Sequence, residues 1–150
     1  MHSACRIVSV DSVLLAVAEA EVPRGQVPTY IRVLFDGVYS WLRTAPVKQT
    51  GHNYVLYDVG TGRNLLVRAG FPVSAAFAET ERVRSLTLAA GEAAHAVHTG
   101  PYHELPRTYS VLQAWCKQVK LQLAAQSWEL YGDWQQDESK LETGIYLRLQ

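Results

Sequence analysis

Apolar positions along the chain change their spacing in a fixed order, and that order occurs twice. In the first half, two short apolar runs are separated by Asp11-Ser12, residue types that favour a turn. Apolar residues then recur at helical spacing after Pro28, which suits the first turn of a helix. Two alternating runs follow and predict a hairpin. The expected elements are strands at residues 6–10 and 13–18, a helix that begins near Pro28, and strands at 53–58 and 65–73.

The second half repeats this plan. A helix with apolar positions on one side is predicted after Pro106, and two more alternating runs follow it. The runs span residues 127–131 and 141–149, and the connection between them is acidic and contains Trp134.

An offset of 74 residues aligns the two halves. It pairs Tyr57 with Tyr131, Trp41 with Trp115, Gly70 with Gly144, and Val55 with Glu129. Self-similarity at a fixed spacing is typical of units that pack against each other. The sequence therefore predicts an internal repeat of residues 5–73 and 80–149 within one domain, residues 1–150. The two copies differ most in chemistry at Val55 and Glu129.

Composition and charge exclude several classes of protein. The chain has 150 residues, of which 48% are hydrophobic and 19% charged, as expected for one globular domain. Its 14 basic and 14 acidic side chains balance, and no basic run is present, so direct nucleic-acid binding by this chain is not expected. No apolar stretch reaches the length of a membrane span. We expect a cytoplasmic protein that has no membrane association.

The histidines and cysteines do not suggest a metal or a cofactor. Cys5 and Cys116 are far apart in the sequence, so both are expected to be reduced and structural. His98 lies close to two other histidines, but a metal site would need convergent geometry and supporting partners. A turn formed by residues 98–102 is the preferred interpretation, and Tyr102 in it is a candidate cleft residue.

Strand alternation suggests where a ligand would bind. If Trp128 and Leu130 face the helix of their own copy, then Glu129 and its neighbours two residues away face the opposite side. By the repeat, Val55 and Tyr57 face that side as well. A groove between the copies would then be lined by Tyr57, Tyr131, Val55 and one carboxylate. Aromatic faces attract cations, and a poorly solvated carboxylate needs a partner, so a flat apolar cation fits such a groove.

The residues also carry a resemblance to a known family. Residues 97–105, Trp115, residues 128–131 and residues 143–147 resemble the second half of the GyrI-like small-molecule-binding family, and residues 51–58 and 70–73 resemble its first half. That family includes the effector-binding domains of AraC-type and MerR-type multidrug regulators. The resemblance implies an α+β fold with two pseudo-symmetric strand-helix-strand-strand modules. It further implies an antiparallel sheet with helices outside and a central cleft that takes lipophilic cations, with Glu129 at the acidic position. Gly132-Asp133-Trp134 replaces a proline that many members have, so the cap of the cleft is not implied.

Each candidate site residue also has a structural interpretation. Glu129 would otherwise be a solvated strand carboxylate. Tyr57 and Tyr131 would be sheet-face tyrosines with hydroxyls in water, and Trp41 and Trp115 would belong to the core. The candidate ligand-binding set is therefore Glu129, Tyr131, Tyr57, Val55, Trp115, Trp41, Tyr102 and His98.

Three functions follow from these features. The first is binding of amphipathic, cationic small molecules without a cofactor. The second is hydrolysis of a small molecule with Glu129 as general acid or base, because relatives of the family include hydrolases. The third is a protein-interaction role like that of the gyrase inhibitor that gives the family its name, which fold alone does not transfer. No helix-turn-helix pattern occurs in these 150 residues, so a stand-alone module or one with a separate regulatory partner is expected.

Overall fold

The chain forms two compact units, each with an antiparallel sheet and one long helix, so the fold is α+β. The computed structural model describes all residues from 1 to 150. We call Ser12–Ala89 the central unit, and Met1–Asp11 together with Ala90–Gln150 the terminal unit. Neither helix is both long and apolar enough to cross a membrane.

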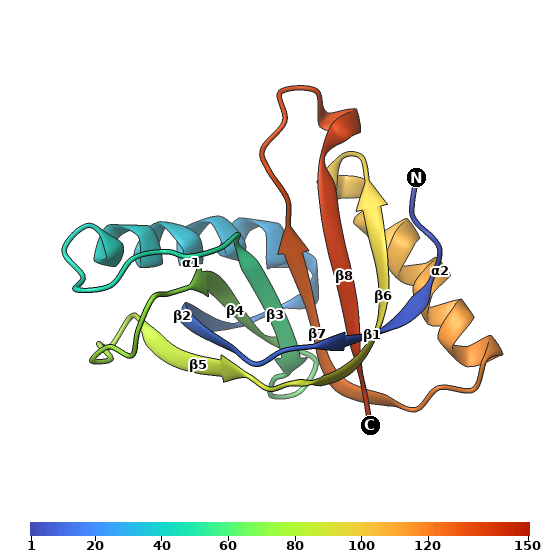
Figure 1. The fold of residues 1–150 in the computed structure, drawn as a ribbon, viewed down its shortest axis with the longest axis horizontal. Coiled ribbons are helices and arrows are strands. Elements are labelled where there is room, and N and C mark those ends of the chain that lie inside the picture. Colours follow the sequence, from blue (N-terminus) through green and yellow to red (C-terminus); the bar gives the residue numbers. More distant parts are fainter. The chain divides into compact units, whose positions relative to one another are not determined.

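The central unit has the strand order β3-β4-β2-β5, and α1 packs on β2 and β4 (Figure 1). Its elements are β2 (Val13–Val22), a short 3-10 helix (Arg24–Gln26), α1 (Val27–Leu42), β3 (Tyr54–Val59), β4 (Leu65–Pro72) and β5 (Arg84–Leu88).

The terminal unit has the strand order β1-β6-β8-β7, and α2 packs on β6. Its elements are β1 (Arg6–Val10), β6 (Gly91–Thr99), a 3-10 helix (Tyr102–Glu104), α2 (Leu105–Gln118), β7 (Leu123–Tyr131), a second 3-10 helix (Glu138–Lys140) and β8 (Glu142–Leu149).

The compact units do not coincide with the two sequence repeats. The pair Asp11-Ser12 connects β1 and β2, but these strands do not pair with each other. β1 pairs with β6, and β5 pairs with β2. The first strand of each repeat is therefore a sheet edge beside the second strand of the other repeat. Local turn chemistry predicted the connection correctly, but strand partners are chosen by tertiary packing.

Each helix begins where the sequence predicts and rests on small side chains. Pro28 and Pro106 lie in the first two positions of α1 and α2, where a missing N–H costs nothing. Beneath α2, Ala94 and Ala96 of β6 are fully buried and belong to one cluster with Leu112. Small residues on the strand allow the helix to approach the sheet closely.

The two cysteines lie in the same core region of the terminal unit. Cys116 belongs to the cluster beneath α2, Cys5 packs against that cluster, and both are free thiols. Burial raises the pKa of Cys116, and Cys5 adds to this effect. The fold thus brings Cys5 and Cys116, which are 111 residues apart in the sequence, into one region of the core.

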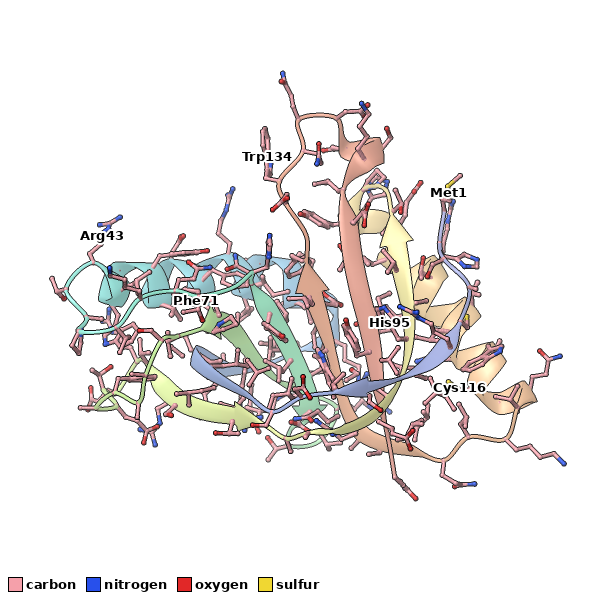
Figure 2. The ribbon with its side chains drawn as sticks, in the orientation of Figure 1. Met1, Arg43, Phe71, His95, Cys116 and Trp134 are labelled. Carbon is pink, nitrogen blue, oxygen red and sulfur yellow. The ribbon has the colours of Figure 1, made fainter.

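The face of the terminal sheet opposite α2 carries a stack of rings. Trp128 lies parallel to Tyr146 at 5.3 Å, and Tyr146 stacks on His95 at 4.2 Å. The guanidinium of Arg148 lies 4.9 Å from the Trp128 ring centre. His95 lies within the sheet (Figure 2) and is only 5% exposed. Its Nδ1 lies 2.9 Å from the carbonyl oxygen of Ile145.

A glycine in the central sheet allows two strands to approach. Gly70 of β4 lies opposite Val17 of β2, and a Cβ at Gly70 would lie 1.8 Å from the carbonyl oxygen of Ala16. At Gly144 of β8 a Cβ would come no closer than 3.1 Å, to the Tyr146 ring. A backbone atom of a paired strand moves less easily than a side chain.

We expect Gly70→Ala to lower the free energy of unfolding by about 3 kcal/mol or more, because β2 must shift to admit the methyl group. Gly144→Ala is the matched control and should cost clearly less. Urea unfolding of both variants measures the difference. If both variants lost the same free energy of unfolding, the close approach of β2 and β4 would not be the reason for glycine at position 70.

Stability should fall in mild acid because of His95. Burial lowers the pKa of His95 from its ordinary value of 6.5, and the charge of Arg6 adds to this effect. The unfolded chain therefore binds a proton more readily than the folded chain, and stability is lost as the pH falls below about 6.5. His95→Phe keeps a ring against Tyr146 but cannot titrate. Urea unfolding at pH 7.5 and 5.5 should show a larger loss for the wild type than for His95→Phe, and identical losses would refute the assignment.

Candidate functional site

Glu129 lies on the face of the terminal sheet that α2 covers. It sits directly opposite Ile145 of β8, so the two side chains share a face, and Ile145 packs in the cluster with Leu112 of α2. Trp128 lies opposite Tyr146 and belongs to the other face. The orientation assumed from the sequence, with Trp128 toward the helix and Glu129 away from it, is therefore wrong. Alternation shows which residues share a face, but both faces bury large side chains, so it does not show which face the helix covers.

Two tyrosine hydroxyls hold the Glu129 carboxylate. The Tyr109 hydroxyl of α2 donates to Oε2 at 2.6 Å, and the Tyr131 hydroxyl of β7 donates to Oε1 at 2.6 Å. These lengths are typical of charge-assisted bonds from a hydroxyl to an ionised oxygen. Glu129 itself is only 4% exposed. The site thus contains a carboxylate whose two oxygens are each fixed by a phenol.

Tyr109 was not among the residues proposed for the site from the sequence. Its ring occupies the apolar stripe of the helix, and it packs partly against the core cluster. Only its hydroxyl takes part in the site. A tyrosine on the apolar side of the helix was the available signal, because a phenol that packs against the core needs a hydrogen-bond partner.

Tyr102 extends the aromatic surface next to Glu129. Its ring meets the Tyr131 ring edge-on, with 5.4 Å between centres. Tyr102 is 45% exposed, and burial of its remaining surface raises the pKa of its hydroxyl. A ring that is both exposed and fixed against Tyr131 is suited to contact a ligand.

His98 is held by the fold rather than presented to solvent. It is 1% exposed on the same face as Glu129. Its Nε2 lies 3.0 Å from the Pro101 carbonyl oxygen, and its Nδ1 lies 2.7 Å from the Thr108 hydroxyl. A carbonyl oxygen only accepts, so Nε2 donates there and, in the neutral ring, Nδ1 accepts from Thr108. The two nitrogens connect the turn after β6 to α2, and the role of His98 toward a ligand remains a prediction.

Thr143 is a polar residue of this face that the sequence did not single out. It lies opposite both Tyr131 and His98 in the ladder. Its hydroxyl oxygen is buried without a hydrogen-bond partner, and the residue is fully buried.

No group of three or more His, Cys, Asp or Glu side chains is arranged to hold a metal ion.

In the central unit, Val55 and Tyr57 share the face that α1 covers. Val55 lies opposite Ala69 and Tyr57 opposite Val67, and Phe71 on the same face packs on Tyr39 of α1. Val55 is fully buried, so a ligand reaches it only if neighbouring side chains move. Their assignment to a ligand site remains a prediction.

The two helical tryptophans lie against apolar neighbours. Trp41 of α1 packs on Phe77, with 4.8 Å between ring centres. Trp115 of α2 packs partly against the cluster around Leu112. Both positions agree with the core interpretation, and their role toward a ligand remains a prediction.

The strand registers change the residue of the central unit that corresponds to Glu129. Gly70 faces Tyr54 on one side, and Gly144 faces Leu130. On the other side, the two glycines face Val17 and Val97. The positions 54 and 130 differ by 76, not 74. The residue before Leu130 is Glu129, and the residue before Tyr54 is Asn53. When the two hairpins are aligned on Gly70 and Gly144, Glu129 therefore matches position 53 and not Val55. The difference of two residues arises because β3 pairs with β4 in a different register from that of β7 with β8.

Known structures share this fold. The C-terminal domain of EcmrR is 19% identical, with a TM-score of 0.86 over 98% of this chain and 97% of that domain. EcmrR has also been solved in a DNA complex, and this chain spans 57% of the EcmrR chain there. SAV2435 bound to tetraphenylphosphonium is 12% identical, with a TM-score of 0.75 over 99% of this chain and 94% of that one. A hydrolase from Listeria innocua, encoded by lin2189, is 12% identical, with a TM-score of 0.64 over 97% and 91% of the two chains.

At these identities the structures show a common fold and nothing further. None of the curated protein sequences matches the chain. The sequence model of the GyrI-like small molecule binding domain, however, matches residues 6–150. The chain belongs to the GyrI-like small-molecule-binding domain family.

Proposed function

We propose that the protein binds amphipathic, lipophilic cations at Glu129 in the terminal unit. The observation that carries the proposal is the carboxylate, 4% exposed and fixed by the hydroxyls of Tyr109 and Tyr131. A negative charge in a poorly hydrated site attracts a cation more strongly than the same charge in water. The rings of Tyr131 and Tyr102 supply apolar and π contact beside it. SAV2435, which has the same fold, is known in complex with tetraphenylphosphonium.

A binding role fits this geometry better than hydrolysis. A general acid must carry a proton to the substrate, and a general base must receive one from water or from the substrate. Here each carboxylate oxygen already accepts a short bond from a phenol. That arrangement fixes the oxygens as acceptors and preserves a stationary negative charge. Such a charge selects a cation without any proton transfer.

The binding event would serve as a signal. The C-terminal domain of EcmrR has this fold, and EcmrR forms a complex with DNA. We infer that the present chain is the ligand-sensing part of a regulatory system and that a different region or partner contacts DNA. The formal net charge of zero agrees with a domain that does not bind DNA itself.

Glu129→Gln should weaken the binding of tetraphenylphosphonium by about tenfold or more, because the charge is removed while the side chain keeps its shape. Triphenylphosphine oxide is a neutral aromatic analogue, and its affinity should change little. Isothermal titration calorimetry with both compounds measures the two effects, and circular dichroism confirms the fold. Equal losses for both compounds would mean that Glu129 does not select charge.

The phenols should also be coupled to the carboxylate energetically. Tyr109→Phe leaves a buried charged oxygen without this donor, which should lower the free energy of unfolding by about 1.5–3 kcal/mol. The same change in the Glu129→Gln background should cost less, since the amide is uncharged. A double-mutant cycle by urea unfolding should give a coupling of about 1 kcal/mol or more. If the effects of Tyr109→Phe and Glu129→Gln on the free energy of unfolding were additive, the hydrogen bond between these residues would not be what stabilises the buried carboxylate.

A further inference from the structure

When the two hairpins are aligned on Gly70 and Gly144, the amide of Asn53 in the central unit matches the carboxylate of Glu129 in the terminal unit. Asn53 precedes the residue opposite Gly70, just as Glu129 precedes the residue opposite Gly144. We infer that Asn53 forms a second, uncharged subsite, which takes a hydrogen-bond acceptor such as a carbonyl or phosphoryl oxygen on an aromatic ligand. The inference extends the proposed function to a second chemical group of the ligand class, and rests on it in that respect.

Each unit connects a helical tyrosine to this polar position. The Tyr39 hydroxyl of α1 donates to Oδ1 of Asn53 at 2.8 Å, as the Tyr109 hydroxyl of α2 donates to Glu129. The Tyr39 ring packs on Phe71 with 5.0 Å between centres. A helical phenol therefore donates to a polar side chain in both units: to Asn53, which lies just before β3, in the central unit, and to Glu129 within β7 in the terminal unit.

The surrounding hydrogen bonds determine how the Asn53 amide is oriented. Gln49 Nε2 lies 2.8 Å from the Gly51 carbonyl oxygen, and a carbonyl only accepts, so this atom of Gln49 is the nitrogen. The same nitrogen lies 3.4 Å from the terminal atom of Asn53 that Tyr39 also contacts. That atom must be the oxygen, because it receives a hydrogen bond from Gln49.

We assign the amide nitrogen of Asn53 to the ligand, because its oxygen is already used as an acceptor within the protein. Its oxygen accepts from Tyr39 and Gln49, while its NH2 group is a donor. Asn53 is partly exposed, and the neighbouring Tyr39 is 36% exposed. A donor beside an aromatic ring held against Phe71 suits an acceptor oxygen attached to an aromatic group. A cation gains nothing from a donor, so the two subsites prefer different groups.

Triphenylphosphine oxide and tetraphenylphosphonium distinguish the subsites, since the first has an acceptor oxygen and the second has a charge. Asn53→Ala and Asn53→Asp both remove the donor. Each should weaken triphenylphosphine oxide by about threefold to tenfold, the effect of one hydrogen bond. Gln113→Glu adds the same charge on the exposed side of α2 and should leave this affinity unchanged.

Tyr39→Phe provides a test that keeps the ring and the packing on Phe71. It removes the hydroxyl that orients the amide and should weaken triphenylphosphine oxide but not tetraphenylphosphonium. The inference is overturned if the wild type does not bind triphenylphosphine oxide. It is also overturned if folded Asn53 and Tyr39 variants bind that compound as the wild type does, or if Gln113→Glu weakens it equally. The effect of Glu129→Gln on tetraphenylphosphonium tests the proposed function separately, so either conclusion can fail alone.

Discussion

A carboxylate that is 4% exposed constrains the terminal unit, because the transfer of an unpaired charge out of water is strongly unfavourable. Tyr109 and Tyr131 meet that requirement from α2 and β7, each with a 2.6 Å bond to one oxygen of Glu129. The bond from Tyr109 requires α2 to lie on this face of the sheet and at this height above it, whereas the bond from Tyr131 forms within β7. The position of the helix therefore decides the hydrogen bonding of the carboxylate as well as the packing of the core.

The packing beneath α2 makes this arrangement possible. Ala94 and Ala96 of β6 are small and fully buried, and Leu112 and Cys116 of α2 pack in the same cluster. His98 adds a polar connection, since its two ring nitrogens join the turn after β6 to Thr108. A change in any of these residues would move Tyr109 relative to the carboxylate without touching a ligand.

The two units share a plan but present different chemistry. In both, a helix with a proline in its first two positions packs on an antiparallel sheet, and a tyrosine of that helix donates to a polar side chain. That residue is an amide in one unit and a carboxylate in the other. The β7–β8 connection is a further difference, since Trp134 lies on it, 78% exposed, and points away from the strands (Figure 2).

The sequence alone predicted the two helices, the hairpin after each of them and the family, and it proposed Glu129 as a candidate site residue, which stays a prediction. Apolar spacing and the two prolines are local signals, and local backbone chemistry decides where helices and hairpins begin. Three features depended on the tertiary structure. Strand partners placed β1 beside β6, and helix packing placed Glu129 on the face that α2 covers. The hairpin registers placed Glu129 one residue before the partner of Gly144 but Val55 one residue after the partner of Gly70. Alternation has a period of two, so it preserves which residues share a face while leaving the choice of face, the partner strand and the register to contacts between distant residues.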